Sequence, residues 1–270
     1  MNVTTLAVPA PVSDASPPSK HLGMFVTLWR RELLRLRRER TRWFGMALQP
    51  LLFWLILGTG LAPTFQLEGS PGLGYQAFFF PGSLVMVVLF TAIFSTITVI
   101  EDRNTGFLQG VLVAPGSRAA LVMGKIAGIT TVVLLQATLF VLLSPIADIA
   151  YGQIHWPALI LGLFLTSVML SSIGMAMAWL LPTSQAYHAI MSVVLLPMWV
   201  ISGALFPSAG GVLGAVMSAN PLAYSVSVVR GAMVPALHTG WSSLIMLAAF
   251  TGVLLTLAIL ACRRSGGRPG

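Results

Sequence analysis

One short polar stretch, Glu101 to Arg118, brings together several residue types that could do chemistry. It combines carboxylates, guanidinium groups, glycines and a proline, and its notable members are Glu101, Asp102, Arg103, Gly106, Phe107, Pro115 and Arg118. Runs without any Asp, Glu, Lys or Arg flank it at 69–100 and 126–147. Each run is long enough to cross a bilayer, for which roughly 20 residues suffice. The stretch is therefore predicted to be a loop at a membrane surface, with solvated charged groups that could pair with another protein.

Motifs for nucleotide, metal and hydrolytic sites are missing from the sequence. Gly124-Lys125 resembles part of a P-loop, but the Ser or Thr that should follow is absent and the spacing is wrong. The four His residues are scattered and Cys262 is the only cysteine, which predicts neither a metal cluster nor an intrachain disulfide. Ser202 and His188 lie near opposite ends of one apolar run, roughly 20 Å apart in a helix. We therefore expect no catalytic residue, no metal and no cofactor bound by this chain.

The composition is that of a polytopic membrane protein. Of the 270 residues, 56% are hydrophobic and 8% are charged, whereas an average soluble domain is roughly 25% charged. The net charge of +8 does not indicate nucleic-acid binding, because the Arg residues cluster beside apolar runs, at 30–42 and 263–268. Basic residues in such positions are a signal of membrane topology. No apolar run contains the carboxylates of a proton relay, which disfavours a proton-driven transporter.

Six apolar runs predict an all-α integral membrane protein with six transmembrane helices. The runs are 43–61, 78–100, 119–143, 156–181, 186–206 and 241–262. Residues 207–239 are also apolar but contain many Gly and Pro residues, which favours two re-entrant half-helices over a seventh span. With six spans and a cytoplasmic N-terminus, only Arg230 of the 15 Lys and Arg residues lies outside. A seventh span would place the C-terminal Arg residues outside, so the positive-inside rule favours six.

The termini are expected to differ in character. We expect residues 1–19 to form a disordered tail and residues 20–42 to form a basic amphipathic helix in the membrane interface. The transmembrane domain is expected at 43–262, and a cytoplasmic tail at 263–270. In the amphipathic helix, Leu22, Phe25 and Val26 belong to the apolar face, while Arg31 and Arg35 lie elsewhere on the wheel. The helix either only anchors the chain or also carries motion into the first span. Lys125, near the start of the third span, is expected to reach back to the interface.

Three groups of residues, taken in order, resemble the permeases of type-2 ABC exporters. The first is Trp29-Arg30-Arg31-Glu32. The second is Glu101-x4-Gly106-Phe107-Leu108, then Val113-Ala114-Pro115-Gly116-Ser117-Arg118 and Gly124-Lys125. The third is Asn220-Pro221-Leu222-x-Tyr224, followed by Arg230. The pattern is most similar to the subgroup that exports daunorubicin-type drugs and nodulation lipo-oligosaccharides, although Phe107 stands where Thr is common.

The resemblance implies a mechanism and partners. Two copies of the permease, or two related permeases, face each other in the lipid bilayer, with a homodimer as the prediction, and two separate ATPase subunits bind ATP and Mg below them. The loop between spans two and three would form a coupling helix on the ATPase. Its predicted residues are Glu101, Asp102, Arg103, Gly106, Phe107, Pro115 and Arg118. A generic surface loop without a partner is the alternative.

The resemblance also draws attention to the opposite end of the spans. Asn220 is predicted to cap the second half-helix, with Pro221 at its first position, and Tyr224 belongs to the same motif. Arg230 either contacts lipid headgroups or closes the exit and touches an anionic substrate group. The substrate pathway is expected at the seam between two copies. Its candidate lining residues, which could equally be lipid-facing filler, are Trp54, Phe90, Phe94, Met198 and Trp199.

The function expected from the sequence is that of a permease subunit in an ATP-driven exporter of the bacterial plasma membrane, with both termini cytoplasmic. Its substrate would be hydrophobic or amphipathic: a drug, a polyketide, a glycolipid or a lipid-linked glycan. A membrane assembly or immunity subunit of similar fold that moves no solute is the main alternative, and an intramembrane enzyme is a third.

Overall fold

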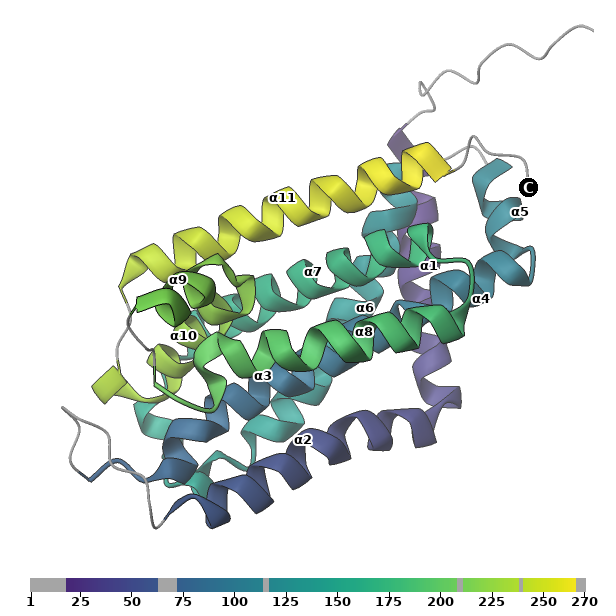
Figure 1. The fold of residues 1–270 in the computed structure, drawn as a ribbon. Coiled ribbons are helices and arrows are strands. Elements are labelled where there is room, and N and C mark those ends of the chain that lie inside the picture. The colour runs from purple at the N-terminus through teal and green to yellow at the C-terminus, as the bar shows by residue number, and fades with distance from the viewer. Residues whose placement is uncertain (1–17, 63–71, 114–116, 208–210, 238–239, 266–270) are drawn as a thin grey trace, which may run out of the picture.

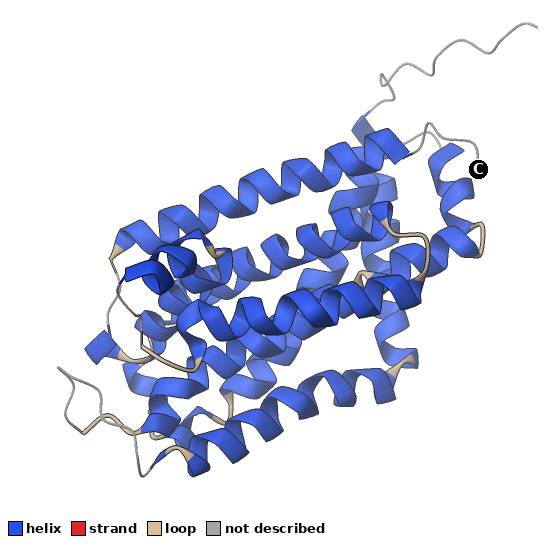
Figure 2. Cartoon of the chain, in the orientation of Figure 1, coloured by secondary structure: helices blue, strands red, loops and turns tan. Residues whose placement is uncertain are grey.

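The computed structural model describes residues 18–62, 72–113, 117–207, 211–237 and 240–265. Residues 1–17 of the predicted tail, the loop at 63–71 and residues 266–270 lie outside these ranges. Within them all regular structure is helical, and Figure 2 shows no strand. The predicted all-α class is thus confirmed for the described residues.

The long helices run alongside one another, and α1 is inclined to them at one end of the bundle (Figure 1). In chain order the α-helices are α1 (Pro18–Arg38), α2 (Arg40–Gly60), α3 (Tyr75–Ser95), α4 (Ile97–Asn104), α5 (Phe107–Val113), α6 (Arg118–Val141), α7 (Trp156–Leu180), α8 (Ser184–Trp199), α9 (Gly211–Ala219), α10 (Pro221–Met233) and α11 (Trp241–Ser265). Short 3-10 turns occupy Ser144–Ala147, Tyr151–Gln153 and Pro235–Leu237, and a π-helical turn, Val200–Ala204, extends α8.

Within the described ranges, five helices are long and apolar enough to cross a membrane. They are Tyr75–Asn104, Arg118–Val141, Trp156–Leu180, Ser184–Ala204 and Trp241–Arg264. A sixth candidate is the pair α9 and α10, which is bent by 89° at its break. The apolar part of α2, Phe44–Gly60, is shorter than the roughly 20 residues of a typical crossing. Five of the six predicted runs therefore coincide with long candidate spans, and the first falls on α2. Five to six such helices are consistent with an integral membrane protein.

The central helix of the bundle is α3. From Tyr75 to Ile93 every residue except Gln76 is buried. It contacts α2, α6, α7 and α10. Aromatic rings contribute to this packing, for example Phe80 of α3 with Phe140 of α6 at 5.0 Å between centroids. A helix that is apolar on all sides is stable in this position because neighbours surround it.

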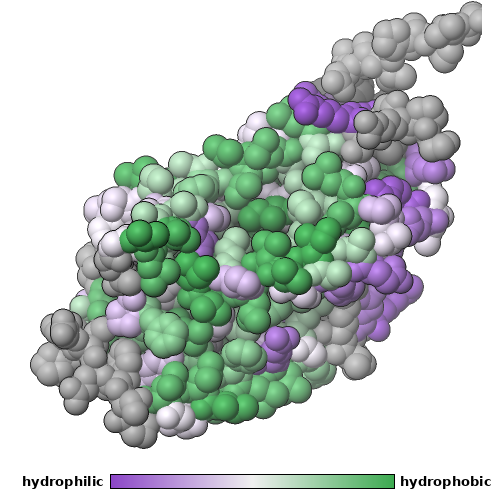
Figure 3. Space-filling model, in the orientation of Figure 1, coloured by the Kyte–Doolittle hydropathy of each residue, from purple (hydrophilic) through white to green (hydrophobic). Residues whose placement is uncertain are grey.

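The outer helices present apolar surfaces. α8 buries a single stripe at four-residue spacing, Tyr187, Met191, Leu195 and Trp199. In α11 only 17% of the most apolar segment is buried. Figure 3 shows apolar residues over most of the visible face, and hydrophilic residues gather near the end that holds α1, α4 and α5 (Figures 1 and 3). Exposed apolar surface of this extent fits surroundings of lipid hydrocarbon.

Helix α1 packs on α6 with a face that includes the buried Leu28 and Glu32. Leu22 and Val26, from the predicted apolar face, are 64% and 44% exposed and lie outside this contact. A position of α1 in the membrane interface stays a prediction. Helix α1 also ends at Arg38, so that the predicted interfacial helix 20–42 is divided between α1 and the start of α2.

Two glycines of α6 permit this close packing. A Cβ atom on Gly124 would lie 2.9 Å from the carbonyl oxygen of Phe25, and one on Gly128 would lie 2.6 Å from Cβ of Glu32. Real Cβ atoms do not approach so closely. The backbones of α1 and α6 can therefore touch only because these positions lack side chains.

Candidate functional site

A cluster of charged side chains joins α1, α4 and α6 at one end of the bundle. We call it the anchor cluster, and its members are Arg31, Glu32, Arg35, Glu101, Asp102 and Lys125. At its centre is Asp102, which is 2% exposed. Arg31 donates two hydrogen bonds to the two carboxylate oxygens of Asp102, at 2.7 and 2.6 Å. Such bidentate pairs are among the strongest charge-assisted hydrogen bonds in proteins.

Lys125 forms the second half of this centre. Its side chain is fully buried, and its Nζ lies 2.6 Å from Asp102 and 2.9 Å from Glu32. The expectation that Lys125 reaches the interface was wrong, because two buried carboxylates lie within its reach. Arg31 and Lys125 together neutralise Asp102 and Glu32. A buried set of charges is tolerated in this way when each charge is paired.

Arg35 extends the cluster toward the surface. It donates to Glu39, which lies between α1 and α2, at 2.8 Å and to Glu101 on α4. The hydrogen bond with Asp102 raises the pKa of the Arg31 guanidinium above its ordinary value, and burial opposes this shift. Three elements that are far apart in the sequence are thus held together by ion pairs.

Arg103 binds another part of the chain. Its guanidinium donates to the carbonyl oxygens of Leu181 at 2.6 Å and Pro182 at 3.1 Å, where α7 ends and the turn to α8 begins. A cation at a helix C-terminus is stabilised by the carbonyl groups that lack helical partners. Glu101, Asp102 and Arg103 were all predicted as solvated groups. The structure instead buries Asp102 and gives each of them a partner within the chain.

The turn between α4 and α5 presents a different surface. Gly106 has a φ of 77°, a conformation that favours glycine because it has no Cβ. This allows the chain to turn sharply after α4, as the glycine suggested. Phe107 follows directly, and the guanidinium carbon of Arg31 lies 3.8 Å from the centre of its ring. The same Arg31 therefore contacts both the buried carboxylate of α4 and the aromatic ring that begins α5.

Of the remaining predicted loop residues, Pro115 is outside the described residues, and Arg118 is the first residue of α6. Arg118 donates to the carbonyl oxygen of Arg263 and so joins α6 to the end of α11. Ser117 caps α6 by accepting from the backbone NH of Ala120 at 3.1 Å, which is a typical N-cap contact.

The span that leads to the anchor cluster is broken at Thr96, between α3 and α4. The hydroxyl of Thr96 donates to the carbonyl of Ile93 at 2.6 Å, and the hydroxyl of Tyr187 bonds to the same carbonyl at 3.0 Å and to Thr96 at 2.6 Å. Gly174 leaves room for these groups, since a Cβ there would lie 2.3 Å from the Thr96 hydroxyl. The carbonyl of Ile93 and the hydroxyl of Thr96 at this break are thus hydrogen-bonded to Tyr187 of α8.

At the opposite end, the Asn-Pro motif holds the bend between α9 and α10. Asn220 accepts a hydrogen bond from the NH of Leu222 at 3.0 Å, and Pro221 is the first residue of α10. The predicted cap is confirmed. The amide of Asn220 also donates to the carbonyl of Met198 at 2.6 Å, and Tyr224 donates to the carbonyl of Ser218 at the end of α9. The motif therefore ties α9, α10 and α8 together.

Arg230 is directed into the protein. Its guanidinium donates to the carbonyls of Phe78, Gly203 and Ala204 at 3.2, 3.0 and 3.1 Å, and it stacks 3.9 Å from the ring centre of Phe78. Gly203 has a φ of 80°. Arg230 thus binds backbone carbonyls in the π-helical turn that extends α8. A role of Arg230 in contacting headgroups or substrate stays a prediction.

The five residues predicted to line a pathway occupy different environments. Trp54 and Trp199 are 2% and 0% exposed and pack inside the chain, where Trp199 donates to the carbonyl of Gly82 at 2.9 Å. Phe90 stacks on Phe94 at 5.6 Å, and Phe94 stacks on His188 at 5.2 Å between centroids. Met198 is partly exposed. Of these residues, Phe94 and Met198 remain accessible from outside the single chain.

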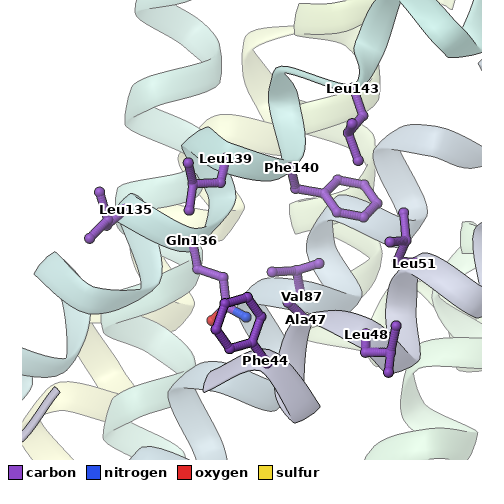
Figure 4. A pocket seen from close by; sticks show the side chains of 10 residues that line it. All are labelled: Phe44, Ala47, Leu48, Leu51, Val87, Leu135, Gln136, Leu139, Phe140 and Leu143. Atoms are coloured by element: carbon purple, nitrogen blue, oxygen red, sulfur yellow. The ribbon is translucent and has the colours of Figure 1, made fainter. Parts of the chain in front are cut away.

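An apolar groove lies between α2 and α6, with α3 at its floor. Its volume is about 470 Å³. Figure 4 shows its lining residues, which are Phe44, Ala47, Leu48, Leu51, Val87, Leu135, Gln136, Leu139, Phe140 and Leu143. The only polar member, Gln136, accepts a hydrogen bond from Thr91 at 2.5 Å. The chemistry of the groove fits an aliphatic chain.

The sequence predictions missed the roles of Arg31, Glu32, Arg35 and Lys125. The sequence contains part of the pattern that could have indicated these roles. Arg31 and Arg35 lie four residues apart, and Gly124 and Gly128 repeat the same spacing, which is typical of a helix contact. Only packing could show that these two patterns belong together. Among the described residues, no group of three His, Cys, Asp or Glu side chains is placed to hold a metal ion.

Comparison with known proteins places this arrangement in a family. Residues 24–234 match the model of the ABC-2 type transporter family. Nodulation protein J of Neorhizobium galegae is 29% identical over 232 residues, which cover 82% of this chain and 85% of that protein. The ycf38 protein of Cyanophora paradoxa, named as a transport permease, is 31% identical over 212 residues, or 75% of this chain and 71% of that protein. The chain with this anchor cluster and bent helix pair is a member of the ABC-2 type transporter family.

Proposed function

We propose that this chain is the permease subunit of an ATP-driven exporter whose ATPase is a separate protein. The observation that carries the proposal is the anchor cluster, which joins the α4–α5 turn to α1 and α6 through buried ion pairs. A turn built into the fold in this way can transmit a force applied to it. The sequence has no P-loop, so the energy would have to come from another chain.

The proposed topology has six spans, with both termini in the cytoplasm of a bacterial cell. In this arrangement α2 is the first span despite its short apolar segment, and α9 with α10 is a re-entrant pair. The anchor cluster and α5 then lie on the cytoplasmic side, as the basic residues favour. Asn220 and Arg230 lie toward the outer side.

The connections of the cluster suggest how motion would spread. A displacement of the α4–α5 turn would act on α1 through Arg31 and Arg35, and α1 continues almost directly into α2. The same displacement would act on the turn between α7 and α8 through Arg103. One input would therefore reach spans on both sides of α3.

We further propose that two copies of the chain form the substrate pathway along α8. Gln185, His188 and Ser192 are exposed on this helix and lie at helical spacing on one side. Polar residues on a membrane span usually face water or protein, because lipid hydrocarbon cannot bind them. A second copy facing this side of α8 would enclose them, together with Phe94.

The proposed substrate is hydrophobic or amphipathic. The support is the apolar groove between α2 and α6 and the aromatic pair of Phe90 and Phe94 beside α8. Neither feature offers a charged group to a ligand.

The test is reconstitution with an ATPase that contains a P-loop and is encoded by a neighbouring reading frame. The two proteins should co-purify, and in proteoliposomes the complex should move a fluorescent acyl-chain lipid only when ATP is supplied. If the chain does not bind that ATPase, the proposal that this ATPase supplies the energy is refuted. A complex that hydrolyses ATP without moving or responding to any amphipathic probe would favour the alternative, a membrane assembly subunit that transports nothing.

A further inference from the structure

The surface that the α4–α5 turn offers to a partner is uncharged. Its exposed described residues are Asn104, Thr105, Phe107, Gln109 and Gly110. None of them ionises. Helices α4 and α5 lie at the end of the molecule where hydrophilic residues gather (Figures 1 and 3), so this uncharged surface does not belong to the apolar band of the spans.

The nearby charges are already bound within the chain. Asp102 is paired with Arg31 and Lys125, and Glu101 is paired with Arg35. Arg103 donates to backbone carbonyls at the end of α7. To pair with a partner protein, the buried Asp102 would have to give up its ion pairs with the fully buried Lys125 and the partly exposed Arg31, and breaking a buried ion pair is strongly unfavourable.

Phe107 is the member of this surface best suited to anchor a partner. One face of its ring is fixed by the guanidinium of Arg31, 3.8 Å from the ring centre, and the residue is 37% exposed. The next residue, Leu108, is 1% exposed and holds α5 against the bundle. A rigid aromatic ring with one open face is the type of side chain that dominates binding energy when it enters a pocket.

We propose that the ATPase subunit receives Phe107 in an uncharged, apolar socket, and that ion pairs contribute little to its binding. The inference rests on the proposed function, because it takes the ATPase as the occupant of this surface. In this arrangement the carboxylates of Glu101 and Asp102 hold α1 in place, and the aromatic ring of Phe107 contacts the partner. Motion of the socket then reaches α1 through the contact between Phe107 and Arg31.

The experiment measures binding of the purified ATPase to the full-length permease in nanodiscs, across a roughly tenfold range of KCl concentration that shortens the Debye length about threefold. We expect the Kd to change less than about threefold, because apolar contacts are not screened. We expect Phe107→Ala to raise the Kd by about tenfold or more, as for an interface hot spot, and Phe107→Leu to raise it less. Phe206→Ala is the matched control, since Phe206 is 59% exposed and lies beyond α8 at the opposite end.

A second pair of variants tests the role of Glu101. The change Glu101→Arg should weaken binding by disturbing α1, because it places two cations side by side at Arg35, and Glu101→Gln, which keeps an acceptor for Arg35, should weaken binding less. A Kd that rises tenfold or more with salt, a Phe107→Ala variant that binds like wild type while remaining monodisperse, or a Glu101→Gln variant that binds as weakly as Glu101→Arg would overturn the inference and leave the proposed function intact. Absence of binding by wild type at every salt concentration would overturn both.

Discussion

At the scale of single residues, Lys125 has the most demanding position in the molecule. Its ammonium group has no exposed surface and joins a carboxylate on α1 to one on α4. A buried cation of this kind is stable because two carboxylates and one neighbouring guanidinium balance the charge. The same arrangement makes the site sensitive to any change that removes one charge.

Replacing Lys125 by Met should therefore destabilise the protein strongly. The change keeps the length of the side chain but leaves Glu32 and Asp102 with too little positive charge, at a cost of about 3–5 kcal/mol. Thermal unfolding in detergent measures the effect. Arg30→Met is the control, because it removes a charge from an exposed position on α1 and should cost less than about 1 kcal/mol. Equal shifts in Tm for the two variants would contradict the assigned role.

At the scale of elements, the contact between α1 and α6 depends on small residues. Gly124 and Gly128 let the α1 backbone and Glu32 approach α6 closely enough for Lys125 to reach its partners. The ion pairs and the glycines thus act together to hold α1 against α6. Neither the charges nor the glycines could act at this place without the other.

Alanine at Gly128 should lower stability, although alanine normally stabilises a helix. The new Cβ would lie 2.6 Å from Cβ of Glu32 and force α1 away from α6. Gly252→Ala in α11 is the matched control, since nothing lies within 4 Å of its Cβ position, and it should gain about 0.5–1 kcal/mol from helix propensity. The two variants should shift Tm in opposite directions. A gain in both would show that α1 is not held against Gly128.

At the scale of the whole molecule, the two ends of the bundle are built differently. Ion pairs between side chains occur at the end with α1, whereas the end with α9 and α10 is joined by side chains that bind backbone carbonyls. Under the proposed function, the end with α1 receives the force from the ATPase. That end is therefore expected to face the cytoplasm.

Single-cysteine labelling can test that orientation. In a Cys262→Ala background, a membrane-impermeant maleimide added to intact cells should label Val212→Cys and should not label Gly23→Cys until the membrane is opened. Both positions are exposed, on α9 and α1 respectively. Labelling of Gly23→Cys from outside, or of both variants from the same side, would refute the proposed topology.

The sequence by itself determined the features that depend on neighbouring residues. Hydropathy located the long apolar helices, because a continuous run of about 20 apolar residues is visible in the sequence whether protein or lipid surrounds it. The Asn220-Pro221 cap and the sharp turn at Gly106 could be predicted because each is decided by a few consecutive residues.

Only the tertiary structure decided how the charged residues are used. Arg31 and Asp102 are 71 positions apart, and Glu32 and Lys125 are 93 positions apart. Helical periodicity places the arginines of α1 relative to their own helix, but it cannot state what another helix brings to them. The loop charges therefore suggested contacts with a partner, whereas packing of α1 on α6 pairs them within the chain. The reason is physical: a buried charge is stable only where a partner of opposite sign lies within a few ångströms, and long-range packing alone sets that distance.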